Sequence, residues 1–204
     1  MPYLGNMNTT FTTLTSSDAN ITDDLTVTDD ASVGGDLTVT GNYTTTGGST
    51  AMTIDANGHI TKPLQPAFLA KVASQIDNMS VSGATNPTIA FGTEIFDQNA
   101  DYNTDGTFTA PVAGRYQLSF FVRIENLDTA VTSYTFQINT SNRNYNYFFD
   151  PDYGDSDTAF YTATLSILAD MDASDTAIVK YYQSGGTAQT DIDADSYFSG
   201  HLAC

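Results

Sequence analysis

Acidic side chains are the most frequent groups in this sequence that could do chemistry. The 204 residues include 22 Asp and 2 Glu, and several Asp are closely spaced in predicted turns. Oxygen ligands at such spacing suit Ca²⁺, and the candidates are Asp150, Asp152, Asp191, Asp193 and Asp195. The EF-hand pattern is absent, because the sixth loop position counted from Asp191 is Ser196 rather than Gly. We expect solvated turn carboxylates that favour solubility, with calcium as the alternative and no other cofactor.

Few residues could act as general bases or nucleophiles. The only histidines are His59 and His201, and the only cysteine is Cys204. On a strand, His201 and Cys204 would face opposite ways, so a Cys–His pair is not expected. A glycosidase-type carboxylate pair is the remaining catalytic alternative among the many acids. We predict that the protein is not an enzyme.

An aromatic run near residue 150 is the strongest candidate for recognition. Tyr and Asn alternate there, and they offer flat apolar area with hydrogen-bonding tips that suits glycan or protein surfaces. The predicted recognition residues are Tyr145, Tyr147, Phe148 and Tyr153. Strand alternation places Tyr145 and Tyr147 on the side of Phe149, which faces a core or another chain. Phe148 and Tyr153 are therefore the two expected to reach the surface.

Charge and composition exclude several classes of protein. Six Lys and Arg against 24 acids give a net charge of −18, which repels nucleic acid and anionic membrane surfaces. No stretch has the roughly 20 apolar residues that a membrane helix needs. The 40% hydrophobic fraction supports one core. Because Thr, Asn, Gly and Tyr are abundant and helix formers are scarce, we predict an all-β protein.

The first 61 residues differ from the rest, since they contain seven Asp and no Lys or Arg. Between residues 19 and 43, apolar residues recur in pairs every six positions, a fibrous β-repeat that includes Leu25, Val27, Val33, Leu37 and Val39. Two modest apolar side chains per repeat cannot bury a core within one chain. We predict that three chains wind about an axis with these side chains inside. The alternative is a disordered Thr-rich linker.

The remaining sequence predicts a hairpin and a sandwich. Residues 51–63 are expected to form a hairpin that turns at Asn57-Gly58. Strand alternation then begins, most clearly where apolar residues share one face from Tyr116 to Ile124, with Phe121 as the exception. Residues 66–203 supply eight to ten short strands, enough for one jelly roll. We expect three parts: an attachment segment at 1–18, a stalk at 19–61 and a head at 62–204.

The head resembles the complement C1q-like globular domain. The residues that carry the resemblance are Phe91, Asp97, Tyr102, Phe108, Gly114 and Tyr116. Two departures are a gap from Tyr102 to Phe108 that is one residue short, and Leu118 at a position that is usually Phe. The resemblance implies a ten-stranded jelly roll of the C1q and tumour-necrosis-factor type, a tight trimer formed through aromatic faces, and a role in recognition.

The stalk lacks the Gly-X-Y period of collagen. It is similar instead to the Thr/Asp/Gly-rich repeats of bacteriophage tail and head fibres, and its start resembles the virion-attachment segment of marine phage fibres. The resemblance implies a homotrimeric virion fibre, bound to other virion proteins by its N-terminus, whose head adheres to a host glycan or protein. The alternative is a capsid decoration protein without a receptor. Because no signal peptide is recognisable, we expect a virion location reached by lysis.

Overall fold

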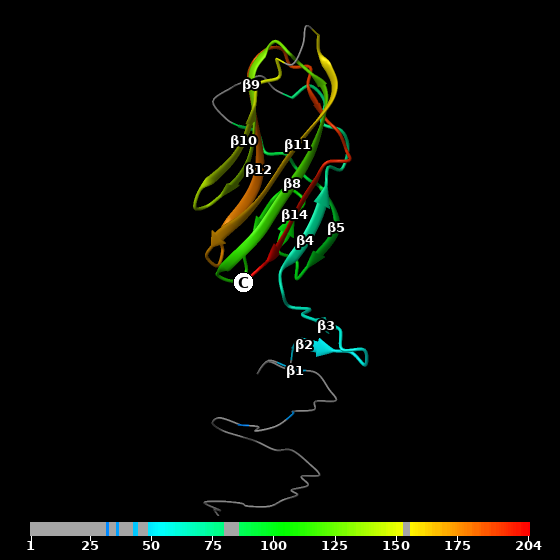
Figure 1. Ribbon diagram of the computed structural model, residues 1–204, viewed down its shortest axis with the longest axis vertical. Helices are drawn as coiled ribbons and strands as arrows, with labels where there is room; N and C mark the ends of the chain where they lie inside the picture. The colour runs from blue at the N-terminus through cyan, green and yellow to red at the C-terminus, as the bar shows by residue number, and fades with distance from the viewer. Residues whose placement is uncertain (1–31, 33–35, 37–42, 45–48, 80–85, 153–155) are drawn as a thin grey trace, which may run out of the picture. The chain divides into compact units, whose positions relative to one another are not determined.

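The computed structural model in Figure 1 describes residues 32, 36, 43–44, 49–79, 86–152 and 156–204. The chain divides into two compact units, and the description concerns the second, Gly41–Cys204. The predicted stalk seam of Leu25, Val27, Val33, Leu37 and Val39 lies outside the described residues, as does Tyr153. The trimeric seam of the stalk therefore stays a prediction.

A small antiparallel sheet precedes the head. It contains β1 (Tyr43–Thr44), β2 (Thr50–Ile54) and β3 (Ile60–Thr61). Between β2 and β3, Gly58 has a φ of +84°, a conformation that glycine adopts without strain. The Asp55 carboxylate accepts hydrogen bonds from the backbone N–H groups of Asn57 and His59, each at 2.8 Å. The predicted hairpin with its Asn57-Gly58 turn is confirmed.

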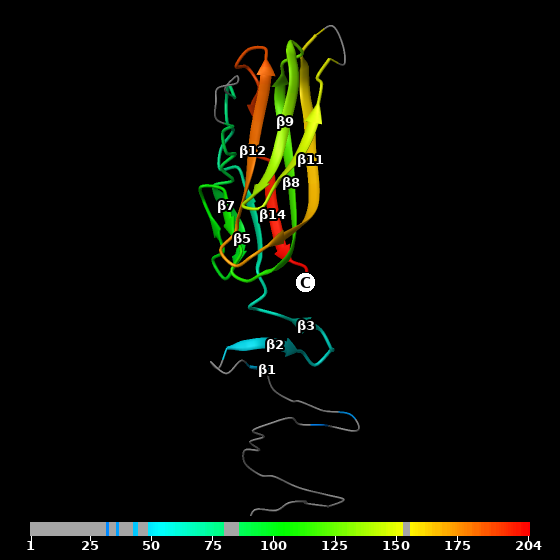
Figure 2. The ribbon, with the colours of Figure 1, turned by 90° about the vertical axis from the view of Figure 1, so that its left-hand side faces the viewer.

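Two antiparallel sheets form the head, and their long strands run side by side in Figures 1 and 2. The first sheet has the spatial order β11 (Thr158–Met171), β8 (Gly114–Leu127), β14 (Tyr197–Leu202), β4 (Ala67–Lys71) and β5 (Thr93–Gln98), and β13 (Asp191–Ile192) also pairs with β8. The second has the order β10 (Asn144–Phe149), β9 (Val131–Thr140), β12 (Thr176–Gly185), β7 (Thr107–Thr109) and β6 (Tyr102–Asn103). We call them the six-stranded and the five-stranded sheet.

Alternation along the strands determines which side chains enter the core between the sheets. On β8 the residues with the parity of Tyr116 are buried, up to Ile124, and the exceptional Phe121 points outward. On β12, Ala177, Val179 and Tyr181 are fully buried. The all-β prediction and the alternation on β8 are confirmed. Among the described residues there is no helix long and apolar enough to cross a membrane.

The predicted number and length of the strands were inaccurate. The described part of residues 67–202 contains eleven strands rather than eight to ten, and β8 and β11 each extend over 14 residues. Both long strands lack Gly and Pro in their interiors, so no turn interrupts them. Two of the extra elements, β6 and β13, have two residues each, too few for alternation to be seen in a sequence.

The chain enters and leaves the head at one end. The N–H of Leu202 on the last strand donates to the carbonyl of Pro66, just before β4, at 3.0 Å. The N–H of Arg115, at the start of β8, donates to the carbonyl of Cys204 at 2.7 Å. From this entry end, β8 runs to Leu127 at the opposite end, where the turn into β9 lies. We call the opposite end the far end.

Candidate functional site

Outward side chains of the six-stranded sheet form the first candidate surface, which we call the six-stranded face. Strand register places Phe121 of β8 between Thr164 of β11 and Tyr197 of β14. Phe121 is 41% exposed and its ring centroid lies 6.4 Å from that of Tyr197. Three more large apolar side chains on this face are exposed by half or more: Phe96, Phe160 and Leu168. They are spread over the face rather than gathered: Phe160 and Leu168 stand four register positions from Phe121 in opposite directions, and Phe96 lies on the edge strand β5. Several exposed apolar side chains on one face favour association with another protein surface.

The polar groups at the centre of the six-stranded face bind one another. Ser119 stands in register with Ser166 on β11, and its hydroxyl group donates to the Ser166 hydroxyl oxygen at 2.8 Å. The Gln117 amide group donates to the same oxygen at 2.7 Å. Because these groups already have protein partners, this part of the face can be covered by an apolar surface at low cost.

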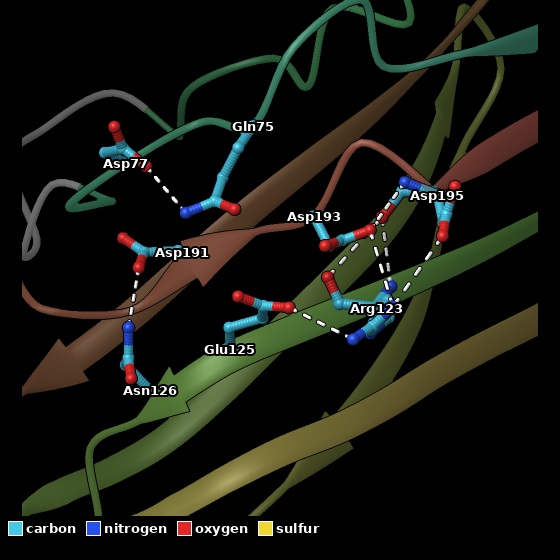
Figure 3. A network of polar contacts seen from close by, with 9 residues as sticks. Gln75, Asp77, Arg123, Glu125, Asn126, Asp191, Asp193 and Asp195 are labelled. Carbon is cyan, nitrogen blue, oxygen red and sulfur yellow. Dashed lines mark hydrogen bonds and ion pairs between the residues drawn. The ribbon is translucent and has the colours of Figure 1, made fainter.

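Arg123 holds a cluster of carboxylates near the far end of the six-stranded face, shown in Figure 3. Its guanidinium group lies 3.2 Å from Glu125, 3.8 Å from Asp193 and 3.7 Å from Asp195. It also lies 4.9 Å from the ring centroid of Phe160, a cation–π contact. Desolvation, together with a hydrogen bond to Asp193 and its charge, raises the pKa of Glu125. One cation thus balances several acids at this site.

The aspartates predicted as possible calcium ligands bind different groups of the protein instead of converging on one point. Asp191 is nearly buried and accepts hydrogen bonds from the Asn78 N–H and the Asn126 amide group, each at 2.7 Å. Asp193 and Asp195 pair with Arg123 (Figure 3). Asp150 accepts from the N–H of Asp152 at 3.0 Å within one turn. In the described part of the chain, no three His, Cys, Asp or Glu side chains are grouped so that they could hold a metal ion.

The outward side of the five-stranded sheet, which we call the five-stranded face, carries the second candidate surface. Register across β10, β9 and β12 places Thr135 between Phe148 and Tyr182. A shallow groove of about 290 Å³ lies here. Its lining residues are all uncharged: Asn86, Ser133, Thr135, Gln137, Phe148, Tyr182 and Ser184. Ser133 and Ser184 lie where β9 begins and β12 ends, which places the groove toward the far end of the head.

The structure separates the predicted recognition residues. Phe148 is 65% exposed and lines the groove. Tyr145 and Tyr147 are half-buried and pack against the core, and the Tyr147 hydroxyl group lies 2.9 Å from that of Tyr161. The groove residues on β9 and β12 were not predicted from the sequence. Their only sequence signal is the outward parity of Ser133, Thr135 and Gln137, which does not reveal the neighbouring strands.

The aromatic residues of the family motif meet in the core. Phe68 stacks on Tyr102 and on Phe108, with centroid distances of 4.7 and 4.8 Å. Phe108 also packs against Tyr116 at 5.4 Å, and the Tyr102 hydroxyl group donates to the carbonyl of Phe91 at 3.1 Å. Burial raises the pKa of the Tyr102 hydroxyl group. These motif residues therefore join the two sheets.

The other motif residues fix turns and close approaches. Asp97 accepts hydrogen bonds from the N–H groups of Asp101 and Tyr102 at 3.2 and 3.0 Å. A Cβ atom at Gly114 would lie 2.6 Å from Leu202 Cδ1 and 2.9 Å from the Cys204 carbonyl, so only glycine fits. The short gap between Tyr102 and Phe108 is spanned by a tight turn in which Gly106 has a φ of +97°.

Comparison with known proteins identifies the family of the head. A family model described as the C1q domain matches residues 67–203. Solved structures that superpose on this chain include the globular domain of zebrafish complement 1qA protein, at 15% sequence identity and a TM-score of 0.49. Murine APRIL at pH 8.5 and at pH 8.0 also matches, at 7% and 8% identity and TM-scores of 0.47. Each covers 68% of this chain and 98% of the solved chain. No curated protein matches the sequence.

Proposed function

Because the chain belongs to the C1q domain family, we propose that it assembles as a homotrimer through the six-stranded face. C1q-like domains commonly form trimers. Phe96, Phe121, Phe160 and Leu168 support the proposal, since these apolar side chains all lie on this face and are exposed in the single chain. Complete burial of an exposed side chain of this size contributes about 1.5–3 kcal/mol, and these side chains, already about half buried, would add roughly half of that each.

The net charge of the chain opposes assembly, so burial of apolar side chains must drive it. Each chain carries a net charge of −18, so three chains repel one another. Arg123 and its carboxylates lie near the far end of the face, away from Leu168 and Gln117. The trimer therefore depends on the apolar residues, and the acids beside Phe160 are partly balanced by Arg123.

The homotrimer acts as a fibre of a phage virion. Residues 19–61 form its stalk, and residues 1–18 attach it to other virion proteins. The pairs of apolar residues that recur every six positions between residues 19 and 43 support this role. These pairs can be buried only by other copies of the chain. The site of action is the particle surface.

The head adheres to the host cell rather than catalysing a reaction. C1q-like and tumour-necrosis-factor-like domains are generally non-enzymatic binding or structural modules. Three equivalent weak sites on one trimer gain affinity through their effective concentration. The five-stranded face, which the trimer leaves free, carries these sites, and the observation that supports adhesion most is its exposed Phe148 beside a polar groove.

Competition for adsorption tests this function. Purified full-length trimer, added before the particles, is expected to lower the number of particles that attach to host cells. A Phe148→Asp trimer serves as the matched control and is expected to compete poorly. If the unmodified trimer leaves attachment unchanged, the protein is a decoration of the particle and the adhesive function is wrong.

No resident cofactor is part of this function. If calcium nevertheless stabilises the trimer, removing it must lower the melting temperature, because a ligand that binds only the folded state adds stability. We expect the melting temperature to be the same with and without a chelator. A decrease that added Ca²⁺ reverses would show that the aspartate turns bind the ion.

A further inference from the structure

The groove on the five-stranded face has the composition of a carbohydrate site. We propose that it binds one uncharged pyranose ring of a glycan. This inference deepens the proposed adhesive function by naming the chemical class of its ligand. Its evidence is the arrangement of Phe148, Thr135 and Tyr182 and the state of the polar groups around them.

Phe148 offers an apolar surface that a sugar ring can cover. Its side chain is 65% exposed although the residue lies within a strand. The next residue, Phe149, points to the other face of the sheet and is buried. Across the sheet, Phe148 pairs with Thr135, which pairs in turn with Tyr182. The two aromatic residues thus flank a floor formed by Thr135, which is only 3% exposed. Aromatic side chains with this placement provide flat contact area at low conformational cost.

The polar groups of the groove have no partner among the described residues. The side chains of Ser133, Thr135, Gln137, Tyr182 and Ser184 line the groove, yet within the described part of the chain none of them forms a side-chain hydrogen bond. On the six-stranded face, by contrast, Ser119, Ser166 and Gln117 bind one another. A sugar ring carries hydroxyl groups that both donate and accept, and these match a set of hydroxyl and amide groups.

Charge and size select the kind of sugar. No lining residue of the groove is charged, and Lys180 shares a row of the sheet with Gln137 without lining the groove. The chain carries a net charge of −18, which repels sialic and uronic acids. The volume of about 290 Å³ is at the small end of the usual range for ligand sites. An uncharged single ring fits these limits better than an acidic or an extended ligand.

Binding by the full-length protein can be measured directly by saturation-transfer NMR. The probes are the methyl glycosides of glucose, galactose, mannose and N-acetylglucosamine at millimolar concentration, with glucuronic acid and N-acetylneuraminic acid as the anionic comparison. At least one neutral glycoside is expected to bind, and the acids are expected to bind more weakly. Binding of no neutral glycoside, or a preference for the acids, overturns the proposal.

Two substitutions locate the site. Phe148→Ala removes an exposed side chain and is expected to weaken binding of the sugar by about fivefold to tenfold, a loss typical of one aromatic contact. Thr135→Val keeps the shape of a buried side chain but removes its hydroxyl group, so the affinity for the sugar decreases while the fold is retained. Val112→Ala, which shortens an exposed apolar side chain outside the groove, is the control. Unchanged binding by both groove variants refutes the site.

The outcomes separate this proposal from the adhesive function. If the trimer competes for host attachment but binds no neutral glycoside, adhesion stands and the sugar proposal is wrong, with a protein ligand in its place. If a neutral glycoside binds through Phe148 but the trimer does not compete, the sugar site stands and the adhesive function is wrong.

Discussion

The two outward faces of the head both expose phenylalanine, but they surround it differently. On the six-stranded face, Phe121 packs beside Tyr197 and is one of several exposed apolar side chains spread over the face, and the serine and glutamine side chains nearby bind one another. On the five-stranded face, Phe148 stands beside hydroxyl and amide groups that have no partner among the described residues.

This difference indicates two kinds of contact. A wide apolar area with satisfied polar groups can be covered by another protein chain without leaving buried donors unpaired. A single exposed ring beside unpaired polar groups suits a small polar ligand, which supplies the missing hydrogen bonds. We therefore assign assembly to the six-stranded face and recognition to the five-stranded face.

Exchanging an aromatic residue for a charge should give the largest difference between the faces. Phe121→Asp places a carboxylate in the proposed interface of every chain, where burial of an unpaired charge costs several kcal/mol. We expect the association constant of the trimer to fall by more than about 100-fold. Sedimentation equilibrium measures this constant.

Phe148→Asp is the matched variant on the other face. It should leave the trimer intact and strongly reduce competition for host attachment. The assignment of the faces is wrong if Phe148→Asp dissociates the trimer or if Phe121→Asp does not.

A change in the shared core should affect both faces together. Gly200 lies between β8 and β4, and a Cβ atom there would lie 2.6 Å from both Leu118 Cδ2 and Phe68 Cε1. Overpacking of this kind costs about 1–3 kcal/mol, so Gly200→Ala should lower the melting temperature by several degrees in thermal unfolding. Gly58→Ala, at a position with open space but a φ of +84°, should cost less. Equal losses would contradict the close packing at Gly200.

The smallest effect concerns the charged end of the six-stranded face. The pKa of Glu125 is raised by desolvation and by Asp193, so the folded state holds its proton to higher pH than the unfolded state. Its contribution to stability is greatest below the usual glutamate pKa and is lost as pH rises through the folded value. Glu125→Gln should lack this decrease and be slightly more stable at pH 7, and the effect is small because Arg123 and solvent offset the repulsion.

Urea unfolding at pH 4 and at pH 7 tests this expectation, with the two proteins compared at each pH. A Glu125→Gln variant that is less stable at pH 7 than the unmodified protein would mean that the ion pair with Arg123 outweighs the neighbouring acids.

Features that depend on one strand could be predicted from the sequence. Alternation on β8 identified the buried side chains from Tyr116 to Ile124 and singled out Phe121. The motif from Phe91 to Tyr116 indicated the family that residues 67–203 match. The exposure of Phe148 also followed from its parity beside Phe149.

The groove could not be predicted, because it depends on strands that are distant in the sequence. Thr135 and Tyr182 become neighbours only when β12 pairs with β9 in the observed register. A shift of one residue would turn Tyr182 into the core and Tyr181 outward. The partners of the acidic residues were equally hidden, since Arg123 meets Asp193 and Asp195 only after β13 has paired with β8.

Sedimentation equilibrium of the unmodified full-length protein at micromolar concentration tests the central claim most directly. Assembly through the six-stranded face predicts a species with three times the mass of the chain. A monomer under these conditions would contradict that claim and leave the exposed apolar side chains of the six-stranded face without a partner.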